Sequence, residues 1–300
     1  MKKHIRTLAI IIFIFIATSS FAQTGDGGEP GAFLKNGFSV RASAMGQSFV
    51  SIADDASAIF YNPGGLINIK GTQAVGMYSK LFSDVDGVNY GTFGLAHNFD
   101  FGIVGIGVAY LNVGDIPYVE NESGPTGLTF SNNQTAVYLS YTKLFLENLN
   151  IGGNLKFINH SMANYSGTGF GLDLGLYSTV NEQLTVGLMF QDLIGPVVKL
   201  NKQEDKFRTK VKFGFVYKPI KGLMLAPEAV FESDKDEIFS IGGEYALFND
   251  MLFLRSGFST MYNSFSAGIG VKYMNAGIDY SFNTHKYLGN INKFGFNVSF

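Results

Sequence analysis

The chain has 300 residues and a formal net charge of −2, so it lacks the broad basic field that nucleic-acid-binding proteins use, and no nucleic-acid partner is expected. Charged residues make up 15% of it, below the roughly 25% usual for soluble domains, while aromatic residues are also 15% and glycines number 37. It has no cysteine, which excludes disulfides and a lipid attached to a cysteine.

Residues 1–22 have the layout of a secretory signal peptide. Basic residues crowd the first six positions, residues 8–16 are apolar, and the small residues Ser20 and Ala22 precede a cleavage point before Gln23. The alternative is a transmembrane anchor, but a spanning helix needs roughly 20 apolar residues and this stretch is about half as long. The sequence therefore predicts export through the general secretory pathway.

Residues 23–70 form a predicted leader and plug segment that does not alternate like a strand. Asp54 is placed to cap a short helix over about residues 55–60, because a carboxylate there accepts amide protons of the first turn. Asn62, Pro63 and Gly64 then end the helix and turn the chain. An ordinary solvent-exposed leader is the alternative, but the small and apolar residues from 42 to 58 would be poorly placed in water.

Residues 71–300 alternate apolar and polar side chains with a period of two, as strands with one lipid face and one lumen face do. In residues 209–217, for example, Val211, Phe213 and Phe215 share one side and Lys210 and Lys212 the other. A helix would place apolar residues three and four apart. About fourteen strands are expected, over residues 71–82, 87–99, 101–113, 134–147, 148–160, 168–180, 183–193, 207–218, 221–232, 237–247, 251–259, 264–273, 275–283 and 292–300.

The fold class that follows is all-β: a transmembrane antiparallel β-barrel with an N-terminal segment inserted in its lumen. Beyond the signal no apolar stretch reaches the length of a membrane helix, and open sheet edges cannot be satisfied in lipid, so a closed barrel is the remaining membrane solution. Short connections alternate with longer ones, which predicts that residues 114–133 and 194–206 are extracellular and that 181–182 and 249–250 are periplasmic.

The last eight residues resemble the β-signal read by the barrel assembly machinery of the outer membrane. A polar residue, a glycine two positions on and two hydrophobic positions that end on an aromatic are matched by Lys293, Gly295, Val298 and Phe300. The alternative is the last strand of a soluble β-sandwich. The match predicts a protein that is inserted into the cell outer membrane by that machinery and then contacts its lipid.

Three short motifs in the leader carry a resemblance to a known family. Residues 41–46 read Arg-Ala-Ser-Ala-Met-Gly, residues 53–58 Ala-Asp-Asp-Ala-Ser-Ala and residues 61–66 Tyr-Asn-Pro-Gly-Gly-Leu. They resemble the N-terminal signature of the PorV/PorQ family of outer-membrane barrels and, more distantly, that of the FadL family of hydrophobic-substrate transporters. Gly64 departs from the pattern, where alanine is usual. The signature positions are Arg41, Ala42, Met45, Gly46, Asp54, Asp55, Ala56, Ser57, Asn62, Pro63, Gly64 and Leu66.

The resemblance implies a fourteen-strand barrel whose N-terminal segment packs inside the lumen, and it implies two functions of different classes. Known PorV/PorQ members serve the type IX secretion system of Bacteroidota as shuttle or attachment subunits for secreted cargo that carries a C-terminal sorting domain. The alternative, as in FadL, is a passive channel for small hydrophobic compounds. Strand number does not decide between them, because fourteen lies between side-chain-filled barrels of eight and open ones of sixteen or more.

The sequence contains no motif typical of catalysis or of metal binding. His97, His160 and His285 have no metal-ligand spacing, and no nucleophile elbow or phosphate-binding loop occurs, so no enzyme, metal or cofactor is predicted, although a Ser/His arrangement across strands stays open. Eight charges are expected on the lumen face, as a selectivity lining or, better supported, as ion pairs among themselves and with the plug, with Asp54 and Asp55 meeting Lys210 or Lys212. The eight are Lys156, Asp173, Lys210, Lys212, Glu228, Glu244, Lys272 and Asp279.

Ten glycines are expected to face the lumen. Glycine on a strand often marks the close approach of another backbone, and here the inserted segment is predicted to be that backbone. The ten are Gly152, Gly169, Gly171, Gly175, Gly187, Gly214, Gly242, Gly268, Gly270 and Gly277.

Overall fold

The computed structural model describes residues 29–81, 87–119, 124–285 and 289–300. The predicted signal peptide, residues 1–22, lies outside these ranges. Among the described residues, no helix has the length and apolar character needed to cross a membrane.

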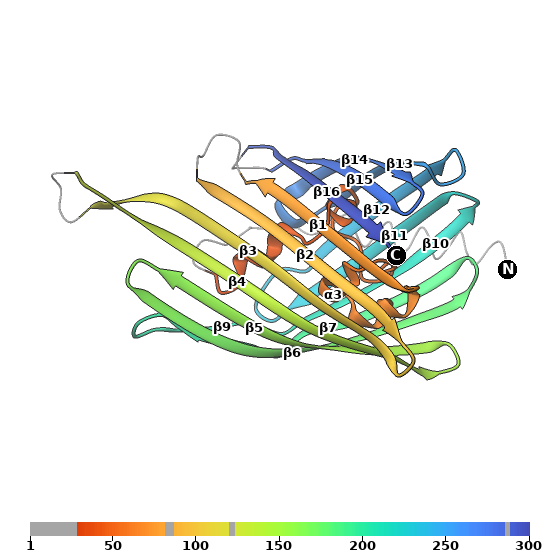
Figure 1. The fold of residues 1–300 in the computed structure, drawn as a ribbon, viewed down its shortest axis with the longest axis horizontal. Helices are drawn as coiled ribbons and strands as arrows, with labels where there is room; N and C mark the ends of the chain where they lie inside the picture. The colour runs from red at the N-terminus through yellow and green to blue at the C-terminus, as the bar shows by residue number, and fades with distance from the viewer. Residues whose placement is uncertain (1–28, 82–86, 120–123, 286–288) are drawn as a thin grey trace.

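The described strands form a closed antiparallel barrel of fourteen, as the alternation predicted (Figure 1). Neighbours in the sequence are neighbours in the wall, and β1 closes the barrel against the last strand. A further pair, β8 (Val197–Lys199) and β9 (Glu204–Lys206), forms a separate two-stranded sheet. The wall strands are β1 (Thr72–Lys80), β2 (Val88–Phe99), β3 (Gly102–Val119), β4 (Pro125–Leu146), β5 (Leu149–Met162), β6 (Tyr165–Asn181), β7 (Leu184–Ile194), β10 (Lys210–Ile220), β11 (Leu223–Glu232), β12 (Ile238–Leu247), β13 (Leu252–Ser259), β14 (Ser264–Tyr273), β15 (Ala276–Asn283) and β16 (Ile291–Ser299).

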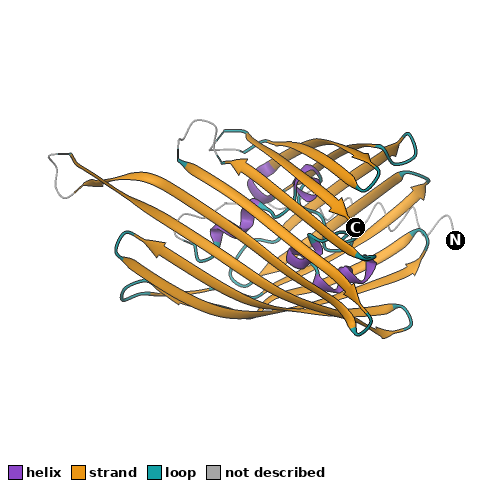
Figure 2. Ribbon diagram, viewed as in Figure 1, coloured by secondary structure: helices purple, strands orange, loops and turns teal. Residues whose placement is uncertain are grey.

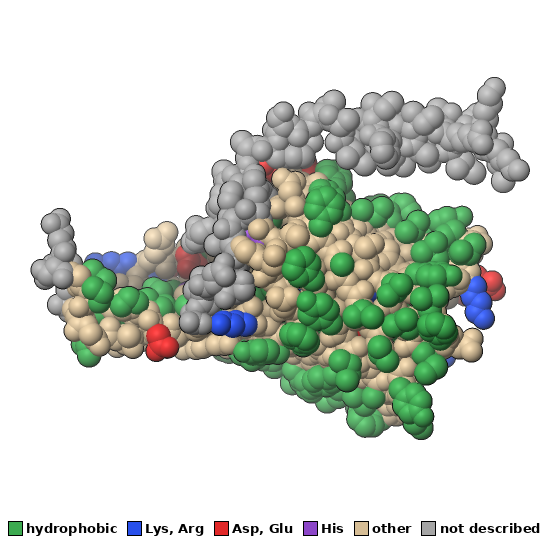
Figure 3. Space-filling view, turned by 90° about the horizontal axis from the view of Figure 1, so that it is seen from above, with side chains coloured by type: hydrophobic (Ala, Val, Ile, Leu, Met, Phe, Trp, Pro, Cys, Tyr) green, Lys and Arg blue, Asp and Glu red, His purple; other side chains and the backbone are tan. Residues whose placement is uncertain are grey.

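The alternation along each strand separates an apolar exterior from a packed interior. On β10, Phe213 is 46% exposed while its neighbour Gly214 is buried. Large apolar side chains cover the outer wall, and charged side chains gather toward its two ends (Figure 3). Such an exterior is suited to lipid, because exposed aromatic and aliphatic side chains are favoured there and charges are not.

The connections fall on two rims. The short-turn rim carries both chain ends of the barrel and the tight turns such as those at 221–222 and 274–275, whereas the opposite rim, named here the mouth, carries the connection 195–209 and the end of the β3–β4 hairpin. Residues 114–119 and 125–133 belong to strands and not to the predicted connection, because β3 and β4 extend together past the rest of the wall (Figure 1). Residues 161–167 are likewise strand on both sides of a two-residue turn.

The connection 194–206, predicted to be extracellular, lies at the mouth and contains β8 and β9. It does not project outward. Instead, β8 packs on the inner face of β6, where a Cβ added at Gly167 or Gly169 would meet the backbone of Lys199 or Val197. Val198 is buried as a result. The alternation of long and short connections cannot reveal this, because length alone does not say whether a loop folds out of a barrel or into it.

The N-terminal segment lies inside the barrel, as predicted (Figure 2). It contains η1 (Ala32–Asn36), α2 (Val40–Ala44), α3 (Ala58–Tyr61) and η2 (Pro63–Asn68), and then enters β1. We call residues 29–70 the plug.

Candidate functional site: the plugged lumen

The plug fills the middle of the barrel with side chains that have almost no exposure. Six signature positions, Ala42, Met45, Ala56, Ser57, Asn62 and Leu66, are each 0% exposed. The short helices suit this role because the backbone amides and carbonyls that a short helix leaves free find partners on the surrounding wall. These signature residues are therefore the packing surface of the plug.

Glycines on the wall let the plug backbone approach, and six of the ten predicted positions do so. A Cβ added at any of them would collide with plug atoms, as at Gly187, where it would meet the Val50 carbonyl, or Gly152, where it would meet Pro63. The other four face different neighbours: Gly169 and Gly171 meet the inward-folded connection, Gly270 meets Asp279 and Arg255, and Gly277 meets Asn297. The six are Gly152, Gly175, Gly187, Gly214, Gly242 and Gly268. Five further wall glycines that meet the plug were not predicted to do so: Gly94, Gly105, Gly107, Gly257 and Gly295.

Two signature glycines have different reasons to be glycine. Gly46 has a φ of +65°, a backbone conformation that other residues rarely adopt, and a Cβ there would lie 2.8 Å from the Phe258 carbonyl oxygen. Both the backbone conformation and the lack of space therefore require glycine. At Gly64, where the family pattern has alanine, a Cβ would lie 3.0 Å from the Gly175 carbonyl oxygen, which is tight contact. Glycine at 64 therefore allows the plug to sit closer to β6.

Asn62 joins the plug to the wall. Its amide nitrogen donates to the carbonyl of Val50 at 2.8 Å and to the β6 carbonyl of Leu176 at 2.9 Å, and its oxygen accepts from the Gly64 amide at 3.1 Å. Pro63 then occupies the first turn of η2, where its missing N–H costs nothing. The Asn-Pro dipeptide thus ends α3, as predicted, and also starts η2.

Replacing Asn62 with alanine is expected to lower the free energy of unfolding by about 2–3 kcal/mol, because it removes three buried hydrogen bonds that join the plug to itself and to β6. The measurement is the temperature at which the folded band converts to the unfolded band in semi-native electrophoresis. Asn68→Ala is the matched control, since Asn68 is only half-buried and its amide donates to the Gly65 carbonyl within the plug and not to a wall carbonyl. Equal effects at the two positions would contradict the assigned role of Asn62.

The start of α3 differs in detail from the expectation for Asp54. The helix spans Ala58–Tyr61, and the carboxylate of Asp55, not that of Asp54, accepts from the Ser57 amide at 2.8 Å. Asp54 instead faces the cavity at the short-turn rim. At the end of α3, burial raises the pKa of the Tyr61 hydroxyl, which stays neutral and accepts from the Phe38 amide at 2.8 Å.

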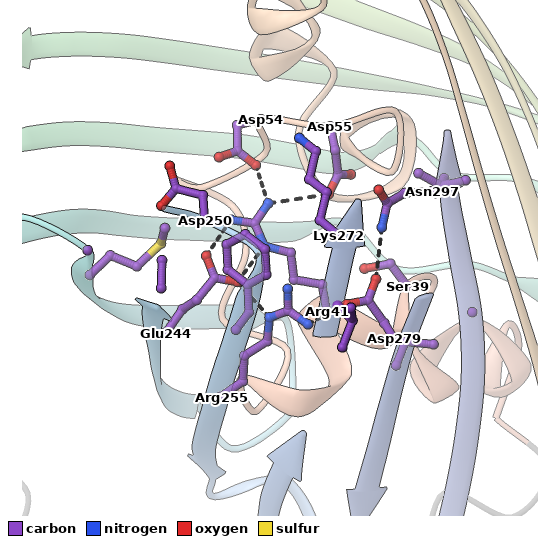
Figure 4. A pocket seen from close by; sticks show the side chains of 18 of the residues that line it. Ser39, Arg41, Asp54, Asp55, Glu244, Asp250, Arg255, Lys272, Asp279 and Asn297 are labelled. Atoms are coloured by element: carbon purple, nitrogen blue, oxygen red, sulfur yellow. Dashed lines mark hydrogen bonds and ion pairs between the residues drawn. The ribbon is translucent and has the colours of Figure 1, made fainter. Parts of the chain in front are cut away.

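Arg41 is the centre of an ion-pair network at the short-turn side of the plug (Figure 4). Its Nε and Nη2 pair with both carboxylate oxygens of Glu244 at 2.8 and 2.9 Å, and Nη1 lies 2.5 Å from Asp54 and 3.4 Å from Asp55. Such a two-point contact fixes geometry as well as charge. The signature arginine and the Asp-Asp pair are therefore one unit, although they are 13 residues apart.

The wall continues this network beyond Glu244. Arg255 on β13 pairs with Glu244 at 2.6 Å and with Asp279 at 2.5 Å, and Asp279 accepts from Asn297 at 3.0 Å. The predicted contact of Asp54 and Asp55 with Lys210 or Lys212 is wrong, because Arg41 is nearer to both carboxylates than any wall lysine. Arg255 was not among the predicted lumen charges, although it alternates along β13 with Leu254, whose side chain points outward.

Two further wall side chains, those of Glu228 and Lys293, form hydrogen bonds with the plug. Glu228 accepts from the amides of Phe49 and Val50 at 2.7 and 2.8 Å. Lys293, predicted as part of the assembly signal, points inward and donates to the Asn36 carbonyl and, at 2.9 Å, to the Ser43 hydroxyl. The ion pairing expected of the lumen charges is found at Lys156, Asp173, Lys210, Glu244 and Asp279, while Glu228 and Lys293 use hydrogen bonds to the plug.

The rest of the C-terminal motif lies in the barrel seam. A Cβ added at Gly295 would meet Val40 of the plug, Val298 pairs in register with Ala74 of β1, and Phe300 is 78% exposed. The Phe300 amide donates to the Thr72 carbonyl at 2.8 Å, which completes the closure. A role of these residues in assembly stays a prediction.

A fully buried triad of charges lies in the wall beside α3. Lys156 Nζ is 2.6 Å from Asp192 and 3.0 Å from Asp173, and the Asp192 amide donates to Asp173 at 2.8 Å. The triad sits at a register shift between β6 and β7, where Leu172 pairs with Ile194 but Leu174 pairs with Phe190. Asp192, with a φ of +56°, was not predicted because the bulge reverses the expected facing of its side chain.

The plug divides the described lumen into cavities on its two sides. At the short-turn rim lies a polar cavity of about 660 Å³, whose floor is the Arg41 network. At the mouth lie two others. One, of about 400 Å³, is mostly apolar and is bounded by Phe33, Leu81, Val88, Leu111 and Met261. The other, of about 390 Å³, is rich in cations and lies beside Phe38, Tyr61 and Phe207.

Comparisons with known proteins agree with this architecture. No protein-family model matches the chain, and no curated protein sequence does so. Among solved structures, the toluene transporter TodX of Pseudomonas putida superposes with a TM-score of 0.60 at 12% identity, over 87% of this chain and 96% of that one. A FadL homologue of Pseudomonas aeruginosa superposes with a TM-score of 0.60 at 10% identity, over 88% and 98%. The chain therefore has the fold of the FadL-like outer-membrane β-barrels.

Proposed function

We propose that the protein is an outer-membrane channel through which small apolar compounds pass, closed at rest by its plug. The observation that carries this proposal is the apolar cavity at the mouth, which has a volume of about 400 Å³ and is lined on the plug side by Phe33 and Gly46. Sites for small molecules span roughly 300–1,000 Å³ and are mostly apolar. The similar fold of a toluene transporter also supports the proposal of a channel for small apolar compounds.

The test is uptake and binding of a neutral apolar fluorophore, N-phenyl-1-naphthylamine. Cells that produce the barrel are expected to take it up faster than cells that do not, and the purified barrel is expected to bind it. Leu111→Gln places an amide in the cavity and is expected to weaken binding about tenfold. Met224→Gln, in the cavity at the other rim, is the matched control. Unchanged uptake together with no binding would overturn the proposal.

A second candidate function rests on the projecting hairpin. β3 pairs with β2 only as far as Val113, and β4 pairs with β5 only from Asn132, so residues 115–119 and 125–130 have edges that no described neighbouring strand covers. Val119 and Leu128 are 60% and 66% exposed there. Free strand edges with apolar side chains are templates for binding another chain. As the second candidate function, we propose that the protein is a type IX accessory of the PorV/PorQ family and that this hairpin binds its secreted cargo.

Deletion of residues 115–130 tests this second function. Proteins with a C-terminal sorting domain are expected to co-purify with the full-length barrel from native membranes and to be lost with the deletion, while the barrel remains heat-modifiable. Retention of such cargo by the shortened barrel would exclude the hairpin as its binding site.

A further inference from the structure

The cation-rich cavity at the mouth has more cations than acids in its lining. It lies between the plug, the connection before β10 and the inner faces of β10, β11 and β12, and its volume is about 390 Å³. Four acidic side chains line it, against six cations: Lys35, Lys206, Arg208, Lys210, Lys212 and Lys235.

Each of the four acids already has its own partner. Glu29 pairs with Lys35 at 2.7 Å and with Lys235 at 3.6 Å, and Glu232 pairs with Lys210 at 3.3 Å. Asp192 belongs to the buried triad, and Glu228 accepts the two plug amides. Of the other cations, Lys206 lies 4.0 Å from Glu204, which is outside the lining, and Arg208 donates to the Ser233 carbonyl, so Lys212 is the cation of the lining that has no direct contact.

Lys212 has a nearby counter-charge but no direct contact with it. It is half-buried on the inner face of β10, and no other residue in the described part of the chain forms a hydrogen bond or a close ion pair with its ammonium group. Glu228 attracts Lys212 electrostatically, but its carboxylate accepts the amides of Phe49 and Val50. A charge partly removed from water is stabilised by a direct partner. An anion in the cavity would supply that contact.

The remaining lining is aromatic and aliphatic. Phe38 and Tyr61 stand edge to face, with ring centroids 5.6 Å apart, and Phe207 lies against the start of the plug, where a Cβ added at Gly31 would meet its ring. Val230 and Ile238 complete the apolar side. Phe38 and Tyr61 are 4% and 3% exposed, so they offer the cavity only their edges, while the half-buried Phe207 can contact a planar ring in stacked or edge-on geometry.

We propose that this cavity binds a compact aromatic anion, with its ring among Phe38, Tyr61 and Phe207 and its charged group at Lys212. The inference deepens the proposed function, on which it rests, by adding a substrate class: small aromatic carboxylates or sulfonates beside neutral apolar compounds. The shared chemistry is one flat apolar body with one negative charge.

The test is equilibrium dialysis of 2-naphthoate and of its neutral analogue 2-naphthamide against the purified full-length barrel in matched detergent. Naphthoate is expected to bind more tightly than naphthamide. Lys212→Met is expected to weaken naphthoate about tenfold, as the loss of a charge-assisted contact does, and to leave naphthamide unchanged. Lys212→Arg is expected to retain binding. Phe207→Ala is expected to weaken both compounds.

Lys272→Met is the matched control, because Lys272 is an exposed lysine that lines the cavity at the opposite rim. Equal binding of naphthoate and naphthamide, or an unchanged affinity of Lys212→Met for naphthoate, would overturn the inference. Those outcomes leave the uptake of the neutral fluorophore untouched, so failure of the anion site and failure of the channel proposal are distinguishable.

Discussion

Deletion of residues 41–66 is expected to raise the single-channel conductance of the barrel in planar bilayers by about an order of magnitude or more, since open barrels of comparable strand number hold water. The deleted residues include Met45, Phe49, Ile59 and Leu66, all 0% exposed in the lumen. Removing them leaves an interior of glycines and polar side chains, which water enters readily. The same deletion is expected to lower the unfolding temperature, because Glu244 and Glu228 lose their plug partners.

Conductance and stability are measured together on this variant. A deletion of the β3–β4 hairpin, residues 115–130, removes chain outside the lumen and is the matched control, expected to leave conductance low. Retained heat-modifiable migration shows that each shortened barrel has folded. A truncated barrel that is as closed and as stable as the full-length protein would mean that the plug does not close the lumen.

Lys156→Met is expected to lower the free energy of unfolding by about 3–5 kcal/mol, because removal of one partner from a buried ion pair leaves uncompensated charge. Asp173 and Asp192 would then face each other with side-chain exposures of 0% and 2%. The bulge that joins β6 to β7 depends on these groups, so we expect the first loss of structure there. The measurement is the unfolding temperature in semi-native electrophoresis.

Two variants make this expectation specific. The triple variant Lys156→Met, Asp173→Asn, Asp192→Asn removes all three charges and is expected to recover most of the stability, since a neutral buried cluster needs no counter-ion. Lys206→Met, at a pair 4.0 Å apart whose lysine is 72% exposed, is expected to cost about 0–1 kcal/mol. If the triple variant is no more stable than Lys156→Met, the loss comes from packing and not from charge.

The sequence alone was sufficient to establish the barrel and most of its strands. The period of two follows directly from the geometry of a strand whose faces meet lipid and lumen, so each alternating segment could be assigned locally. The predicted span 264–273 agrees with β14, Ser264–Tyr273, and the other spans agree to within a few residues except where β3 and β4 extend. The glycine pattern likewise indicated close approach of another backbone.

Only the tertiary structure decided which groups meet inside the lumen. Arg41 and Glu244 are 203 residues apart, and nothing local distinguishes Glu244 from Glu228 or Asp279 as the wall carboxylate that pairs with Arg41. The inward fold of residues 194–206 and the surroundings of Lys212 have the same cause. Each depends on how strands far apart in the sequence curve around the plug, and a periodic pattern reports the side on which a residue lies but not what stands opposite it.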